Sequence, residues 1–359
     1  MLKARRTKIT GDRQLLILPL ALSLFGLFMI FDASSAAAWR DFGDRFYYVK
    51  HQALWLLLGW VFFAFFSWVN LFWLKKIALP AFLVSLILLV VVLIPGVGRE
   101  VYGGRRWLPI MGFGLQPAEI MKITLTLYLA TLFEKRKNFW SFVLILGLVL
   151  GLVLLEPDLG TGVLVATIAF VVYFLAGAPM KEIGLMALAG AIAGPLLILL
   201  SPYRKQRLLT FLDHSFDAQG ASYHVRQVLI ALGGGGFLGR GLGQSRQKFL
   251  FLPEVTTDSI FAIIAEEFGF VGATVVILVL FYLLYRAFRL ILKVKDPFSQ
   301  LLIAGLTASI GLQTLINLGA MVALVPLTGV PLPFISYGGS SLLVCLSAMG
   351  IIYNISKNV

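Results

Sequence analysis

The sequence predicts an all-α polytopic membrane protein with about ten transmembrane helices, and three observations support that prediction. Of the 359 residues, 59% are hydrophobic and only 13% are charged, and the mean hydropathy is +0.93. Apolar runs of about 20 residues, enough to cross roughly 30 Å of hydrocarbon, recur along the whole chain. These runs are continuous rather than alternating, which excludes a transmembrane β-barrel. We therefore expect a single integral membrane domain over residues 1–359.

The apolar runs define the expected spans in chain order. Basic residues precede the first run, but that run is longer than the hydrophobic part of a signal peptide, so it predicts an uncleaved first helix. The predicted spans cover residues 15–33, 52–69, 77–94, 117–133, 139–155, 161–177, 183–200, 259–285, 299–324 and 340–355. The single cysteine, Cys345, lies in the last span, so an intrachain disulfide is excluded.

The distribution of Lys and Arg predicts the orientation. An even number of spans places both termini on one side of the membrane. The short loops on that side carry sixteen Lys and Arg residues, against six in the short loops on the other side. By the positive-inside rule, both termini are cytoplasmic. Residues 201–258, between spans seven and eight, then form one large extracytoplasmic loop.

Basic residues also gather on the predicted outer face, beside the membrane edges. Long translocated loops tolerate such charges, which is one explanation for them. However, Arg binds phosphate oxygens in a bidentate fork, so the clusters favour an anionic lipid-linked substrate. Nucleic acid is not expected as a partner on this face. The candidate substrate-binding residues of this group are Arg105, Arg106, Arg204 and Arg207.

Polar residues or prolines occur inside or between the spans at three places. Glu119 and Lys122 share one helical face at i and i+3, and they form either a structural ion pair or part of a substrate site. Glu156 and Asp158 flank a proline at the outer edge of spans five and six. Near the end of the chain, Pro326, Pro331 and Pro333 exclude a helix, and irregular backbone at membrane depth must face protein or a water-filled cavity.

Two further patterns accompany these interruptions. Gln313 and Asn317, at i and i+4, either line that cavity or join helices. The glycine-rich stretches 233–236 and 239–243 lack the flanking residues of a nucleotide site, and we expect them to form a flexible outer loop.

Asp258 is the most informative residue, because it ends the long polar loop and directly precedes an apolar run. A charge at membrane depth is costly, so such a residue indicates a functional site. The alternative is that Asp258 caps the following helix. The positive end of that helix would favour the ionised carboxylate, which makes a base available at neutral pH but weakens it.

Six motifs resemble those of the SEDS family of bacterial cell-wall proteins (shape, elongation, division, sporulation). The resemblance covers essentially the whole chain and is greatest for the elongation branch, with the division branch a close relative. Val255 and Thr256 depart from the family pattern. The motifs are Gly103–Trp107 (GGRRW), Gln116–Glu119 (QPAE) with Lys122, Glu156–Thr161 (EPDLGT), Leu252–Glu254 (LPE) with Thr257 and Asp258, Glu266–Gly269 (EEFG), and Gly329–Phe334 (GVPLPF) with Ser336–Ser340 (SYGGS).

The resemblance implies a peptidoglycan glycosyltransferase of the bacterial cytoplasmic membrane, polymerising lipid II through β-1,4 bonds on the outer face. It also implies a class B penicillin-binding protein and other elongation-complex membrane proteins as partners. Asp258 would be the catalytic base. Basic residues would stabilise the pyrophosphate, and Ser336 and Ser340 join the candidate substrate-binding residues.

Two other functions stay open: a lipid II flippase, which needs alternating access to both sides, and a non-catalytic scaffold for cell-wall synthases. The sequence does not settle whether a cofactor takes part. Asp158, Glu156 and Asp258 carry the oxygen ligands that Mg²⁺ or Mn²⁺ prefer, so a divalent cation is a further possibility. His51, His214 and His224 show no paired metal-ligand spacing.

Overall fold

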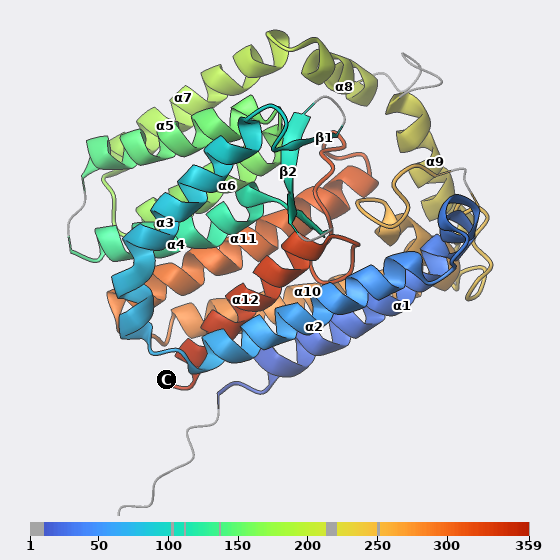
Figure 1. Ribbon diagram of the computed structural model, residues 1–359, viewed down its shortest axis with the longest axis horizontal. Helices are drawn as coiled ribbons and strands as arrows, with labels where there is room; N and C mark the ends of the chain where they lie inside the picture. Colours follow the sequence, from blue (N-terminus) through green and yellow to red (C-terminus); the bar gives the residue numbers. More distant parts are fainter. Residues whose placement is uncertain are drawn as a thin grey trace, which may run out of the picture.

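Each of the ten predicted spans falls on a helix of the computed structural model (Figure 1), which describes residues 11–101, 104–110, 113–135, 138–212, 221–249 and 252–358. The basic N-terminal residues, Gly103 and His214 lie outside these ranges. The ten helices are α1 (Gln14–Phe42), α2 (Tyr47–Trp68), α3 (Leu71–Leu93), α4 (Pro117–Phe133), α5 (Phe139–Leu155), α6 (Leu159–Leu175), α7 (Met180–Leu199), α10 (Ile260–Ile291), α11 (Pro297–Met321) and α12 (Gly339–Ser356).

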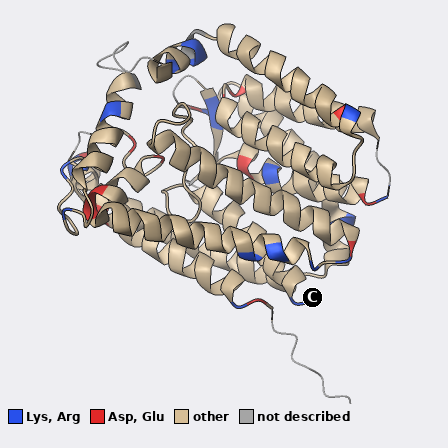
Figure 2. Ribbon diagram, turned by 180° about the vertical axis from the view of Figure 1, so that it is seen from behind, with Lys and Arg blue, Asp and Glu red and all other residues tan. Residues whose placement is uncertain are grey.

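Helix length agrees with a membrane-spanning bundle. Within the described ranges, seven helices are long and apolar enough to cross a membrane. The other three, α4, α5 and α6, have 17 residues each, a rise of about 25 Å and the lower end of what spans a bilayer. Most charged residues lie toward the ends of the helices (Figure 2). The ends of the described chain meet, since Asp12 N donates to Ser356 Oγ at 3.0 Å.

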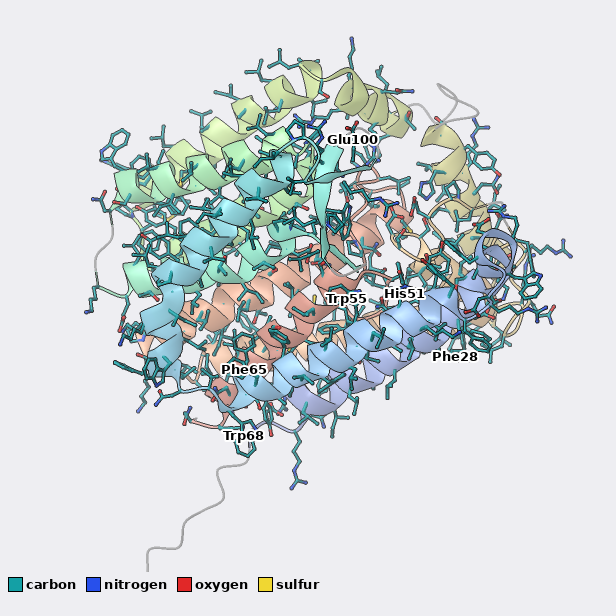
Figure 3. The ribbon with its side chains drawn as sticks, in the orientation of Figure 1. Phe28, His51, Trp55, Phe65, Trp68 and Glu100 are labelled. Atoms are coloured by element: carbon teal, nitrogen blue, oxygen red, sulfur yellow. The ribbon has the colours of Figure 1, made fainter. Side chains whose placement is uncertain are left out.

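The centre of the bundle is formed by α11 and α12, whose small residues allow close packing. A Cβ at Gly350 of α12 would lie 2.5 Å from the Phe63 carbonyl oxygen of α2. The Trp55 ring of α2 lies directly against Gly339, the first residue of α12 (Figure 3). Helix α7 lies at the periphery of the bundle (Figure 1). Its Leu185, Leu188, Leu196 and Leu199 are exposed, as expected of a lipid-facing helix.

Residues 99–115, which no sequence pattern predicted to be strands, contain a small antiparallel sheet. Its strands are β1 (Arg99–Val101), β2 (Gly104–Ile110) and β3 (Phe113–Leu115), in the order β1-β2-β3. The β1–β2 register pairs Glu100 with Arg105. The sheet therefore carries Arg105 and Arg106 on neighbouring residues of β2, whose side chains point to opposite faces.

Residues 201–258, the predicted loop between spans seven and eight, are partly helical. They contain α8 (Pro202–Leu212) and α9 (Ala221–Gly234). These short helices are amphipathic rather than continuously apolar, so the search for membrane-length runs does not detect them. They place Arg207 beside Leu327, in the irregular segment between α11 and α12, and His224 beside Ser259, just before α10.

The glycine-rich stretches are packed against α10 and do not form the expected flexible loop. Arg240 N and Gly241 N donate to the carbonyl oxygens of Glu266 and Glu267, both at 3.0 Å. A Cβ at Gly239 would lie 2.1 Å from the Glu267 carbonyl oxygen. Glycine is required here because two backbones meet without room for a side chain.

The predicted eighth span is interrupted rather than continuous. Gly269 has φ +68° and ψ −167°, so α10 consists of a short part before this residue and a longer part after it. Phe270 N donates to Gly236 O at 2.9 Å, outside the regular helix pattern. The glycine-rich segment thus supplies backbone partners at the break.

Replacing Gly269 by Ala is expected to destabilise the protein by about 1–3 kcal/mol from backbone strain alone, because its φ is positive. The added Cβ would also lie 2.2 Å from Gly239 N, which is a steric clash. Gly184→Ala is the matched control: it lies in α7 with nothing within 4 Å of its Cβ, so its stability should not fall. Thermal unfolding of both variants in detergent measures the difference. Equal midpoints would show that the break is not a constrained junction.

Candidate active site

Asp258 lies immediately before α10 and is held by two neighbouring segments. Asn317 of α11 donates from Nδ2 to the Asp258 carbonyl oxygen at 2.9 Å, and Tyr337 N donates to Thr256 O at 2.7 Å. The helix-cap position belongs to Ser259, whose side chain makes no capping hydrogen bond. The Asp258 carboxylate instead accepts from Thr257 Oγ1 at 3.3 Å. These contacts favour a positioned side chain over a helix cap.

Burial changes the acidity of Asp258 in the direction opposite to the sequence-based expectation. Its side chain is only 7% exposed. Burial, followed by the nearby Glu254 charge, raises the pKa of Asp258 to about 6, and Thr257 and Arg207 oppose that rise. The carboxylate is still mostly ionised at neutral pH, and it is a stronger base than an exposed aspartate.

His224 of α9 is a neighbour of this segment that the sequence did not identify. Its Nε2 lies 2.6 Å from Ser259 Oγ. Burial lowers the pKa of His224 to about 4, so the ring is neutral at physiological pH. No local pattern surrounds His224, because its partner is 35 residues away in the chain. The packing of α9 beside the start of α10 brings His224 close to Asp258, and a local sequence pattern does not show that packing.

The irregular segment 327–331 forms a wall beside Asp258, and side chains from other elements hold it. Arg207 of α8 donates from NH1 to Leu327 O at 2.6 Å. Asn317 bonds Val330 O, and Gln313 bonds Pro331 O, both at 2.9 Å. Of the two roles predicted for Gln313 and Asn317, these contacts fit the one in which they join elements together.

Glu119 and Lys122 form an ion pair inside the bundle. Lys122 Nζ lies 2.8 Å from Glu119 Oε1 and donates to Gln313 Oε1 at 2.8 Å. Lys122 is 1% exposed. The other carboxylate oxygen, Glu119 Oε2, has no hydrogen-bond partner among the described residues. The Lys122 ammonium group is therefore enclosed by its hydrogen-bond partners, whereas Glu119 Oε2 accepts no hydrogen bond among the described residues.

A small cavity of about 80 Å³ is lined in part by residues 328–331, and Asp258 is not among its lining residues. It has room for a water molecule or two. Glu119 faces this cavity, and Lys122 is not among the residues that line it. The lining residues are Arg106, Trp107, Gln116, Glu119, Asp158, Thr161, Leu164 and Thr328–Pro331.

Arg106 and Asp158 stabilise the turn that ends α5 and begins α6. Arg106 donates from Nε to Glu156 O at 2.8 Å and from NH2 to Pro157 O at 2.7 Å. Asp158 caps α6 by accepting from Thr161 N at 3.0 Å. The Glu156 carboxylate is fully buried, and neither oxygen has a partner in the described chain. Burial, with the Asp158 charge second, raises the pKa of Glu156 to about 8.

Glu156→Gln is expected to stabilise the protein at alkaline pH. Because the folded-state pKa is raised, the stability that the neutral acid provides is fully present below its unfolded pKa, near 4.5, and is lost as pH rises through about 8. The thermal midpoint of the wild type should therefore fall between pH 5 and pH 8.5. Gln removes that fall and raises the midpoint at pH 8.5 by about 2 °C or more. Parallel curves for the two proteins would contradict this.

The remaining predicted residues are spread over several elements. Arg105 lies 3.6 Å from Glu100 across β1 and β2, and Arg204 donates to Leu197 O of α7 at 3.3 Å. Ser336 Oγ accepts from Leu332 N, and Ser340 Oγ accepts from Gln116 N. The basic residues predicted to bind substrate therefore do not form one cluster. Arg207 lies beside Asp258, whereas Arg106 lines the cavity.

The three carboxylates suggested for a divalent cation do not converge. Glu156 lies beside Asp158, whereas Asp258 lies beside Glu254. Within the described ranges, no group of three or more His, Cys, Asp or Glu is placed to hold a metal ion. The three carboxylates therefore do not form one shared cation site, and a divalent cation held by fewer of them stays a prediction.

A second charged network lies at the break in α10. Lys248 Nζ bonds Asp32 of α1 and Glu267 of α10, each at 2.8 Å. Glu266 accepts from Ser245 Oγ and from the backbone of Arg246 and Gln247. Residues 245–248 thus provide partners for both buried acids of the Glu266–Gly269 motif.

Fold and site together define a polytopic α-helical membrane protein in which the buried carboxylate of Asp258 precedes α10, near the neutral His224 and near Arg207. The chain belongs to the FtsW/RodA/SpoVE family of cell cycle proteins, whose family model matches residues 13–359.

Similar proteins cover nearly the whole chain. Stage V sporulation protein E of Bacillus subtilis is 39% identical, covering 98% of each chain. The probable peptidoglycan glycosyltransferase FtsW of Trichlorobacter lovleyi is 38% identical, over 97% of this chain and 93% of that protein.

Solved structures show the same fold. A peptidoglycan synthase complex, described as coordinating polymerisation and crosslinking, contains a chain with TM-score 0.79 and 30% identity, covering 97% of this chain and 98% of that one. Rod shape determining protein RodA of Thermus thermophilus has TM-score 0.72 and 29% identity, covering 97% of each chain.

Proposed function

We propose that this peptidoglycan glycosyltransferase polymerises lipid II into β-1,4-linked glycan on the outer face of the cytoplasmic membrane, with Asp258 as the base. The observation that carries the proposal is a buried carboxylate with a pKa of about 6 that adjoins a cation. A sugar hydroxyl is a poor nucleophile, and a positioned carboxylate accepts its proton as it attacks the anomeric carbon. The pyrophosphate of the donor leaves from the opposite side.

The neighbouring residues have distinct parts in this proposal. Arg207 is the predicted cation that lies nearest Asp258, and it is the candidate for stabilising the leaving pyrophosphate. His224 is neutral and bonded to Ser259, so its part is to position the start of α10. Arg106 and Glu119 line the small cavity beside residues 328–331. Lys122 bonds Glu119 and Gln313, and Gln313 in turn holds Pro331 O.

The test is polymerisation by purified protein in liposomes given lipid II alone. Formation of glycan strands supports the proposal. Transport of lipid II between leaflets without glycan would favour the flippase, and failure of both would favour the scaffold. The observed polar residues around Asp258 favour an enzyme over these alternatives, because a flippase or a scaffold has no need of a carboxylate with raised pKa beside a cation.

The outward orientation of this site is also a proposal, supported by the asymmetry of basic residues. Single cysteines at Gln244 and Lys295, both exposed positions, are introduced into a Cys345→Ser protein. An impermeant maleimide added to cells stripped of their outer envelope should label position 244 and leave position 295 unlabelled. The reverse pattern would place Asp258 on the cytoplasmic side.

We also propose a class B penicillin-binding protein and other elongation-complex membrane proteins as partners, in cell elongation and shape. The resemblance to a chain of a synthase complex and to RodA supports this role, whereas the sporulation and FtsW relatives support the division alternative. Expression in cells depleted of either their elongation or their division polymerase separates the two roles. Rescue of the division-depleted cells alone would exclude elongation.

A further inference from the structure

A row of aromatic rings leads from the exposed turn between α1 and α2 to the segment that carries Asp258. Phe42 is stacked on Tyr47, with ring centres 3.7 Å apart. Tyr47 meets Tyr48 edge-to-face at 5.5 Å, and Tyr48 meets Tyr337 edge-to-face at 5.2 Å. Phe42 is 48% exposed, so the row is open at its outer end. We call Phe42, Tyr47, Tyr48 and Tyr337 the aromatic row.

Hydrogen bonds fix the inner end of the row to the Asp258 segment. Tyr337 N donates to Thr256 O at 2.7 Å, two residues before Asp258. Gln52 of α2 bonds the backbone on both sides of Tyr337, donating to Ser336 O and accepting from Gly338 N, each at 3.3 Å. The rings of α2 and the ring of Tyr337 therefore keep their relative positions. Figure 3 shows His51, next to Gln52, at this end of α2.

We propose that the aromatic row binds the sugar rings of the glycan strand as it extends from the site, a role that rests on the proposed function. An aromatic face carries negative partial charge, and the C–H face of a pyranose carries positive partial charge, so the two stack. The tyrosine hydroxyls add hydrogen-bonding groups at the ring edges. A product that grows by repeated addition needs such contacts beyond the two reacting sugars.

Anchoring at the membrane interface is the competing explanation for aromatic residues in this position. Interfacial anchors lie at the depth of the lipid headgroups, and this role does not require their rings to contact one another. The row differs because its rings contact one another in sequence and end at a segment hydrogen-bonded to the Asp258 loop. Trp39 of the same turn is 57% exposed and packs with Arg45 instead. It is therefore a matched control for anchoring alone.

Binding can be measured without catalysis, using Asp258→Asn protein in detergent. The probe is a lipid-free tetrasaccharide of alternating N-acetylglucosamine and N-acetylmuramic acid, titrated by calorimetry. Tyr48→Leu, which removes one ring, is expected to weaken binding about fivefold. Tyr48→Phe and Trp39→Leu should bind within about twofold of the parent protein. Phe42→Leu, at an exposed position whose change leaves the fold intact, should also weaken binding and shorten the glycan strands made by the otherwise wild-type enzyme.

The outcomes separate this inference from the proposed function. Unchanged tetrasaccharide binding in both Tyr48→Leu and Phe42→Leu, or no binding by the parent protein, would overturn the aromatic row, even if the wild type polymerises lipid II. Equal effects of Trp39→Leu and Phe42→Leu on membrane insertion, with no change in sugar binding, would identify anchors and overturn it as well. If tetrasaccharide binding depends on the aromatic row but the protein makes no glycan, the sugar-binding role of the row would stand and the polymerase function would be rejected.

Discussion

Asp258→Asn is expected to abolish glycan synthesis while leaving the protein folded and able to bind lipid II. The change preserves size and removes the proton acceptor, so the rate should fall by about 10²–10⁴-fold. The Asp258 backbone contact with Asn317 does not involve the altered group, and the thermal midpoint should change little. The measurement is strand formation by purified protein in liposomes, with its class B penicillin-binding partner present.

The acidity of Asp258 provides an independent check on the same role. With a pKa of about 6, the wild-type rate should decline about tenfold per unit as pH falls below 6, because the protonated acid cannot accept a proton. A near-wild-type rate for Asp258→Asn would exclude it as the base. Glu254, whose charge acts on Asp258, would then be the next residue to replace.

Lys122→Met is expected to destabilise the protein by about 3–5 kcal/mol, since removing one partner of a buried ion pair leaves the other uncompensated. Glu119 would retain a charge at a position that is 4% exposed. Adding Glu119→Gln removes that charge at similar volume, so the double variant should recover most of the lost stability. Unfolding in detergent compares the single and double variants with wild type.

Activity of the double variant decides between the two predicted roles of this pair. Normal glycan synthesis in a stable Lys122→Met/Glu119→Gln protein would show that the pair is structural. A stable protein with strongly reduced synthesis would place the pair in the substrate site. Failure of the double variant to recover stability would contradict the ion-pair explanation, because the hydrogen bond from Lys122 to Gln313 would then be the dominant contact.

The fold was predictable because each transmembrane helix is encoded locally, in the hydropathy of its own residues. Asp258 was predictable for the same reason: a charge beside an apolar run is visible in a short stretch of sequence. Contacts between distant segments were not predictable. His224 meets Ser259 across 35 residues, and burial beside Glu254 raises the pKa of Asp258 where the helix end alone predicted the opposite.

Two other differences have the same origin. The glycine-rich stretches looked flexible because composition alone does not reveal the surface on which a backbone packs. Arg105 and Arg106 looked like one phosphate clamp. The strand that carries them directs neighbouring side chains to opposite faces, however, and one bonds the turn at Glu156 while the other pairs with Glu100.

The Lys248 network has a consequence for how the protein is made. Asp32 of α1 is synthesised more than two hundred residues before its cation, which comes from the segment preceding α10. Until residue 248 has been translated, Asp32 lacks the cation that it meets in the folded protein. The network is complete only when residues 245–248 meet Asp32, Glu266 and Glu267. We therefore expect nascent chains truncated before Lys248 to be cleared by membrane proteases, whereas chains that include α10 persist.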